Sequence, residues 1–173
     1  MVNRKILVRS FTPLLIVLLM AIVSGCGSVN HKLSIVDDYT LQPRTKIEVG
    51  KVTNETGKTF DIDIEQILTD AFAEVLRKEK LLPVGGEGHR LLLTSRIVEY
   101  EKGSAFKRWL LPGWGSTVIS IEGDLRDVDQ VVGSFQARRT VSIGGGFTIG
   151  AWRKIFASIA KDVVKDLRSK IPK

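Results

Sequence analysis

The chain has 173 residues and a formal net charge of +7, from 26 Lys and Arg against 19 Asp and Glu. It holds a single cysteine, so no disulfide can form within one chain and the fold must rest on its hydrophobic core. The length suits one domain of ordinary size.

The first 26 residues carry the pattern of a secretory signal. A basic opening without acidic residues precedes an apolar run at positions 14–23, and the small residues Ser24 and Gly25 follow. The run has about ten residues, whereas a helix that spans a bilayer needs ~20. The cations of the opening are Arg4, Lys5 and Arg9. Removal of residues 1–25 leaves 148 residues with a charge of +4, too mildly basic to indicate nucleic acid as a partner.

Cys26 stands where cleavage of such a signal is expected. Residues 23–26, Val-Ser-Gly-Cys, resemble the bacterial lipobox, in which the cysteine is acylated and becomes the new N-terminus. The resemblance implies an anchor of three acyl chains, such as palmitate, which would be close to permanent. The alternatives are an uncleaved membrane anchor and a secreted form with a free thiol. Gly27 lacks the aspartate of an inner-membrane retention signal, so we expect the periplasmic face of the outer membrane.

Residues 26–45 are mostly polar and are predicted to form a lipidated tether, with positions 33–36 as a candidate short strand. The domain itself is predicted to span residues 46–173. Its first strand is expected at 46–52, where Ile47 and Val49 share a face.

Residues 61–80 show the clearest periodicity, because their apolar side chains recur at helical spacing. Asp63 and Gln66 have the spacing of a capping box, and Asp61 puts a second anion near the start of the helix. Pro83 and the glycines after it end the helix. The apolar stripe consists of Ile64, Ile67, Leu68, Ala71, Phe72, Val75 and Leu76.

Three strands and a second helix complete the predicted domain. The strands are expected at 90–100, 117–127 and 134–143, with a hairpin connection at 127–133, and the helix at about 151–170. In the first of these strands Leu91, Leu92 and Leu93 suggest burial on both faces. In the third, Arg139 interrupts an apolar face. The β-α-β-β-β-α order predicts an α+β two-layer sandwich, with an antiparallel meander and both helices on one sheet face.

The remaining sequence offers little chemistry. His31 and His89 have no partners at metal-ligand spacing, and no serine lies in a GxSxG elbow. Asp127 and Asp129 fall in a turn, where acids serve structure. The Gly144–Gly146 stretch leads toward a helix but lacks the Gly-Lys-Ser/Thr of a phosphate-binding loop. We therefore predict no catalytic residue, no cofactor, no metal site and a protein that is not an enzyme.

The loop at positions 106–115 is the most suggestive segment, because it concentrates aromatic, basic and glycine residues between two strands. Trp and Arg are typical anchors of protein interfaces, and aromatic and basic side chains together also suit a lipid headgroup surface. The third alternative is a lid on the domain's own core. The candidate interaction residues are Phe106, Lys107, Arg108, Trp109 and Trp114.

Several features of the chain together resemble the domain-of-unknown-function 4410 family of Gram-negative lipoproteins. They are Lys107-Arg108 and Gly113-Trp-Gly115 in the loop, the strand after it, the Gly133 turn, the triple glycine and the closing helix. The resemblance covers about residues 46–171. It implies an outer-membrane or periplasmic lipoprotein without an assigned activity. The element order is also similar to small periplasmic domains of envelope-assembly lipoproteins, as an analogy of fold.

Two functions remain open at this point. The first is a non-enzymatic outer-membrane lipoprotein, attached through Cys26, that acts by contacts with another envelope protein. The second is a small-ligand or glycan-binding module, or a hydrolase, with a cleft near Trp109, Trp114 and Gly144–Gly146. The sequence leaves the identity of the partner and the oligomeric state open.

Overall fold

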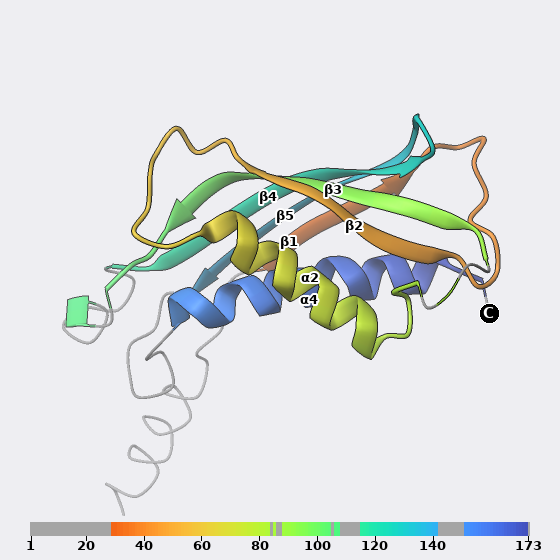
Figure 1. Ribbon diagram of the computed structural model, residues 1–173. Coiled ribbons are helices and arrows are strands. Elements are labelled where there is room, and N and C mark those ends of the chain that lie inside the picture. Colours follow the sequence, from red (N-terminus) through yellow and green to blue (C-terminus); the bar gives the residue numbers. More distant parts are fainter. Residues whose placement is uncertain are drawn as a thin grey trace, which may run out of the picture.

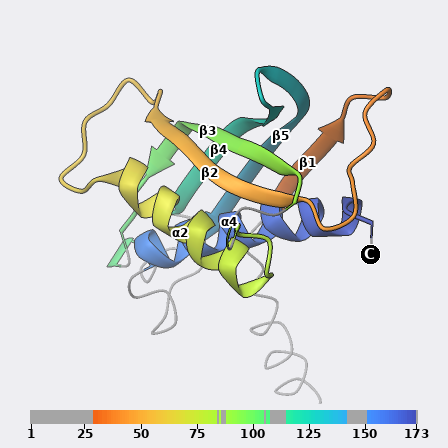
Figure 2. The same cartoon turned by 45° about the vertical axis from the view of Figure 1, so that its right-hand side comes forward.

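The computed structural model describes residues 29–83, 85, 88–104, 106–107, 115–141 and 151–172. Five strands form one sheet in the order β1-β5-β4-β3-β2, and two helices lie side by side against one of its faces (Figures 1 and 2). The elements are β1 (Val29–Ile35), β2 (Lys46–Asn54), α2 (Ile64–Lys78), β3 (Arg90–Glu101), β4 (Thr117–Asp127), β5 (Gln130–Val141) and α4 (Ala151–Lys170). No helix in these described ranges is both long and apolar enough to cross a bilayer.

From β2 onward the predicted α+β two-layer sandwich is confirmed, with the order β-α-β-β-β-α. Strands β3, β4 and β5 form the antiparallel meander. β2 pairs parallel to β3, with Ile47 opposite Leu91, and α2 makes the crossover between them. Parallel neighbours need such a crossover because a tight turn cannot return the chain to the same end of the sheet.

Within the segment 26–45, predicted as a tether with a candidate strand at 33–36, Val29–Ile35 forms the edge strand β1. It pairs antiparallel with β5 from Val29 opposite Arg139 to Ile35 opposite Gly133. This pairing satisfies the backbone groups of β5 that would otherwise form a free edge. Only Leu33 and Ile35 of β1 pack against the core, so the strand lacks the apolar alternation that identifies strands in sequence.

Helix α2 begins with the Asp63 half of the predicted capping box, whereas the Gln66 side chain donates to Asp70 at 2.8 Å. The Asp63 side chain caps it by accepting a hydrogen bond of 2.9 Å from the Gln66 amide. Such a cap satisfies an amide that has no partner within the helix. Asp61, expected to serve the helix dipole, instead forms an ion pair of 2.9 Å with Lys102. This ion pair lowers the pKa of Asp61, mainly through the hydrogen bond from the ammonium group.

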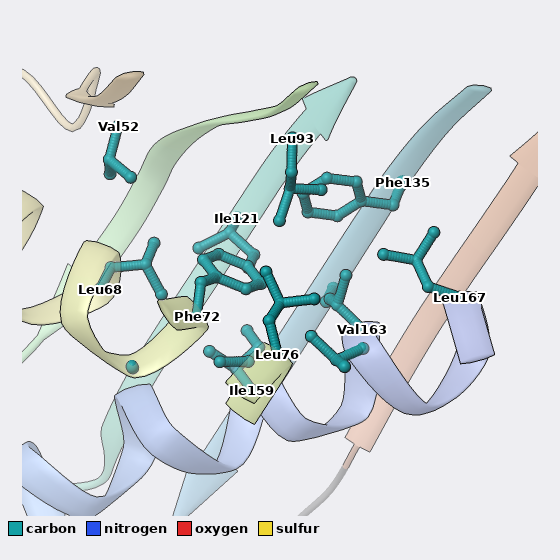
Figure 3. Close-up of a cluster of buried hydrophobic side chains, with 14 of the residues drawn as sticks. Val52, Leu68, Phe72, Leu76, Leu93, Ile121, Phe135, Ile159, Val163 and Leu167 are labelled. Atoms are coloured by element: carbon teal, nitrogen blue, oxygen red, sulfur yellow. The ribbon is translucent and has the colours of Figure 1, made fainter. Parts of the chain in front are cut away.

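The helices supply the core with the side chains that the sequence predicts (Figure 3). Leu68 and Phe72 of α2, and Ile159 and Val163 of α4, all expose 2% of their surface or less. The ring of Phe72 meets Phe135 of β5 edge-on, with ring centroids 6.3 Å apart. This contact joins the first helix to a strand that lies 63 residues later in the chain.

Three details of the meander differ from the predictions or explain them. Leu92 is half-buried between the buried Leu91 and Leu93, so β3 lies inside the sheet but is covered on one face only. Arg139 can lie on the apolar face of β5 because its guanidinium forms an ion pair with Asp162 of α4. The hairpin needs only two connecting residues, 128 and 129, because β5 begins at Gln130 and not at the predicted position 134.

We predict that Phe72→Ala destabilises the domain by about 3–5 kcal/mol, because it removes a fully buried ring and leaves a cavity between α2 and β5. Arg77→Ala, on the exposed side of the same helix, should change the free energy of unfolding by no more than about 0.5 kcal/mol. Urea unfolding of both variants measures the difference. Equal effects would contradict the two-layer packing.

Candidate functional site

The predicted interaction loop is only partly within the described residues. Phe106 and Lys107 are exposed, and Phe106 leaves 66% of its surface accessible, so this ring does not act as a lid on the core. Arg108, Trp109 and Trp114 lie outside the described residues, as do Cys26 and the Gly144–Gly146 stretch. The cleft expected between the tryptophans and the triple glycine therefore stays a prediction.

The sheet face opposite the helices carries two groups of charged side chains that are linked by hydrogen bonds and ion pairs. In the first group, Arg138 donates to Glu99 at 3.0 and 3.1 Å, and the Ser120 hydroxyl donates to Glu99 at 2.6 Å. These hydrogen bonds, that from Arg138 foremost, lower the pKa of Glu99. Glu99 of β3 is therefore ionised and accepts hydrogen bonds from side chains of the two neighbouring strands, β4 and β5.

The second charged group centres on Arg96 of β3. Its guanidinium donates to Glu122 at 2.8 and 3.2 Å and lies 4.0 Å or less from Asp124 and Glu55. The hydrogen bond with Glu122 is the main cause that raises the pKa of Arg96. Each member of the group is about one-third exposed or more, so the charges stay accessible to a partner.

Two shallow hollows lie over this charged face, with volumes of about 290 and 370 Å³. Both are lined by Lys32, Glu122 and Gln136; Arg96 borders the smaller hollow and Arg138 the larger. We call this surface the open face and define it by Lys32, Arg96, Glu99, Glu122, Gln136 and Arg138. It offers both signs of charge and shallow depressions, which suits a polar macromolecular surface better than a small apolar ligand.

At the opposite end from the loop, the fold brings together three residues that the sequence does not link. The Tyr39 hydroxyl donates to Asp127 at 2.8 Å, and His89 Nε2 lies 3.0 Å from the same carboxylate oxygen. His89 Nδ1 is buried and has no hydrogen-bond partner among the described residues. Burial and the bond to Asp127 raise the pKa of Tyr39 to about 12, so the phenol keeps its proton.

This cluster links three segments of the chain at one end of the sheet. Tyr39 lies between β1 and β2, His89 directly precedes β3, and Asp127 ends β4. No serine or cysteine is among its hydrogen-bond partners, and no group of three or more potential metal ligands occurs in the described ranges. The prediction that Asp127 serves a turn was incomplete. No spacing in the sequence indicates the cluster, because its members are separated by 38 residues or more.

His31 also gains a partner that sequence spacing does not reveal. Its Nδ1 lies 2.5 Å from Asp166 of α4. The contact joins the edge strand β1 to the helical layer.

We predict that Asp127→Asn destabilises the protein by about 1 kcal/mol near neutral pH, because the ionised carboxylate accepts two hydrogen bonds. The bond from Tyr39, followed by that from His89, lowers the pKa of Asp127 in the folded state. Its contribution is therefore complete above the unfolded carboxyl value of ~3.9 and disappears as the pH falls through the lower folded value.

Urea unfolding at about pH 7 and about pH 3 tests this dependence. The difference between wild type and Asp127→Asn should shrink at the lower pH, and Asp129→Asn in the same turn serves as the control. A difference that is equal at both pH values would refute the role of the ionised carboxylate.

Similarity to solved structures supports the fold. The chain resembles the PelC dodecamer from Paraburkholderia phytofirmans in two crystal structures, one of a point variant. Identity is 18% and 16%, and the TM-score is 0.57 in both. Each comparison covers 86% of this chain and 100% of PelC. Protein XCC0632 from Xanthomonas campestris, of family DUF330, is 11% identical over 72% of this chain and 88% of its own, with a TM-score of 0.46.

No curated protein matches the sequence. Residues 35–145, more than half of the chain, match the family described as Domain of unknown function (DUF4410). This is the family that the loop, the hairpin and the closing helix resemble. The chain therefore belongs to the DUF4410 family.

Proposed function

We propose that this protein is an outer-membrane lipoprotein that faces the periplasm, held by acyl chains on Cys26, and that it acts through protein contacts without a catalytic centre. The signal pattern and the lipobox-like residues 23–26 support the anchor. The open face supports the contacts and is the observation that carries the proposal.

The open face is suited to a protein partner because one side of the sheet already supplies stability. Both helices pack on the other side, so the open face is not required for the core (Figure 2). Its charges form pairs that are partly solvent-exposed, which contribute little to folding, about 0–1 kcal/mol each. A partner with complementary charges can replace these pairs at small cost and gains specificity from them.

The partner can be another envelope protein or a further copy of this chain. The PelC structures are dodecamers, and their similar fold supports assembly of copies as one form of the proposal. The mixed charge of the open face is compatible with either, because a surface that carries both signs can complement a copy of itself.

We predict that Cys26→Ser releases the protein from the membrane or leaves it as an uncleaved precursor, because the acylated sulfur is lost. Fractionation should find the wild type with the outer membrane. A cleaved Cys26→Ser form that still sediments with membranes would refute the anchor, and recovery of the wild type with the inner membrane would refute the sorting.

We also predict that Arg138→Glu removes the protein from its complex in gently solubilised envelopes. The substitution places a second carboxylate beside Glu99 and reverses the charge of the open face at that point. Arg77→Glu, on the exposed side of α2, should leave the complex unchanged. Native gel electrophoresis measures the size of the complex.

The charge swap Glu99→Arg with Arg138→Glu separates binding from folding. It restores the ion pair, so the melting temperature should return close to that of the wild type, while the complex stays lost because the surface remains inverted. A complex that survives in both variants would contradict the proposal. Binding of a glycan or small ligand by all variants would favour the alternative function instead.

A further inference from the structure

The strand register places one end of the sandwich next to the proposed lipid anchor. Val29 pairs with Arg139, Arg139 with Ile119, and Ile119 with Tyr100, so one row crosses four strands near this end. Cys26 lies three residues before Val29, a span of at most ~11 Å. The acyl chains therefore hold this end, which we call the anchored end, close to the bilayer surface.

The loop predicted to interact leaves the sheet at the anchored end. β3 ends here at Glu101 and β4 starts here at Thr117, next to the end of β5 (Figure 1). Helix α4 also starts here, since the Tyr100 hydroxyl lies 3.4 Å from the Trp152 carbonyl oxygen. The end of β3, the start of β4 and the start of α4 therefore lie together at the anchored end.

The described side chains of this end include aromatic rings and cations, together with Asp61 and Glu101, which are paired with Lys102 and Lys58. Phe106 is the most exposed aromatic ring among the large apolar residues of the described chain. The ring of half-buried Trp152 has two cations over it, with Lys102 Nζ 5.1 Å and Arg153 Cζ 4.9 Å from its centroid. We call this set the anchored-end patch: Lys102, Phe106, Lys107, Trp152 and Arg153.

Of the patch cations, Lys102 is paired with Asp61, whereas Arg153 has no compensating charge in the first turn of the helix that carries it. The first turn of α4 has no acidic residue, whereas α2 starts with the Asp63 cap and Glu65. A helix N-terminus favours anions, so Arg153 and Lys154 add positive charge where it is electrostatically unfavourable. An external anion at this end would compensate both the helix dipole and these side chains.

We propose that the anchored-end patch is a lipid-contact surface, which lies on the phosphate groups of phospholipid headgroups in the leaflet that holds the Cys26 lipid. The inference rests on the proposed anchor. Aromatic rings favour the interface between headgroups and acyl chains, and cations are attracted to an anionic leaflet. The patch thus fixes how the domain is turned relative to the membrane, which a lipid tether alone does not.

The test uses the mature lipidated protein in vesicles of phosphatidylethanolamine and phosphatidylglycerol. Because the single natural cysteine carries the lipid, one introduced cysteine takes an environment-sensitive fluorophore. Lys154→Cys reports on the first turn of α4 beside the patch, and Asp129→Cys reports on the β4–β5 turn at the other end. We expect a blue shift and quenching by a lipid-borne quencher at position 154 and neither at position 129.

Phe106→Ser with Arg153→Glu, in the Lys154→Cys background, should abolish the quenching while the protein still floats with the vesicles. Arg77→Glu is the matched control and should leave the quenching intact. Protein that fails to float indicates that the anchor itself is wrong. Floating protein with equal signals at positions 154 and 129 would overturn the lipid contact, as would quenching that the patch variant leaves unchanged. Protection of position 154 only in native envelopes would assign the patch to a protein partner and likewise overturn it.

Discussion

The structure depends on the burial of one sheet face under two helices that come from distant parts of the chain. α2 crosses from β2 to β3, α4 follows β5, and both place their apolar stripes in one core on the same face of the sheet. No described element covers the other face. The asymmetry gives the domain one side that stabilises the fold and another that the core does not require, and our proposal places the protein contacts on this second side.

The short distance between Cys26 and β1 adds a second constraint. A long tether would let the domain rotate freely above the membrane, but here at most ~11 Å of chain separates Cys26 from the sheet. β1 is itself held by its ladder with β5 and by the contact of His31 with Asp166. If Cys26 carries lipid, the sandwich meets the bilayer with one end, and the open face points along the membrane surface toward neighbouring proteins.

The sequence predicted the parts of the fold in which periodicity is strong. Apolar spacing and capping chemistry act between residues close in sequence. They therefore allowed prediction of the apolar stripe of α2, the Asp63 cap and the helix at 151–170. Of β1 only the end was predicted, as the candidate strand at 33–36, because Leu33 and Ile35 are the residues of this strand that pack on the core. Its place in the sheet comes from backbone hydrogen bonds, which any side chain permits.

Contacts between residues that are far apart in the chain could not be predicted from the sequence either. Tyr39, His89 and Asp127 meet only because the β1–β2 connection, the start of β3 and the end of β4 share one end of the sheet. The open face was visible as alternating polar positions in β5, but its pairing of Arg138 with Glu99 depends on the register of three strands.

The central claim, that the open face and not the helical layer makes the protein contact, is tested most directly by site-specific photo-crosslinking in intact envelopes. A photoreactive residue at Gln136 samples the open face, and one at Ala157 samples the exposed side of α4. The account predicts protein adducts from position 136 and none from position 157. Adducts from position 157 alone would contradict it.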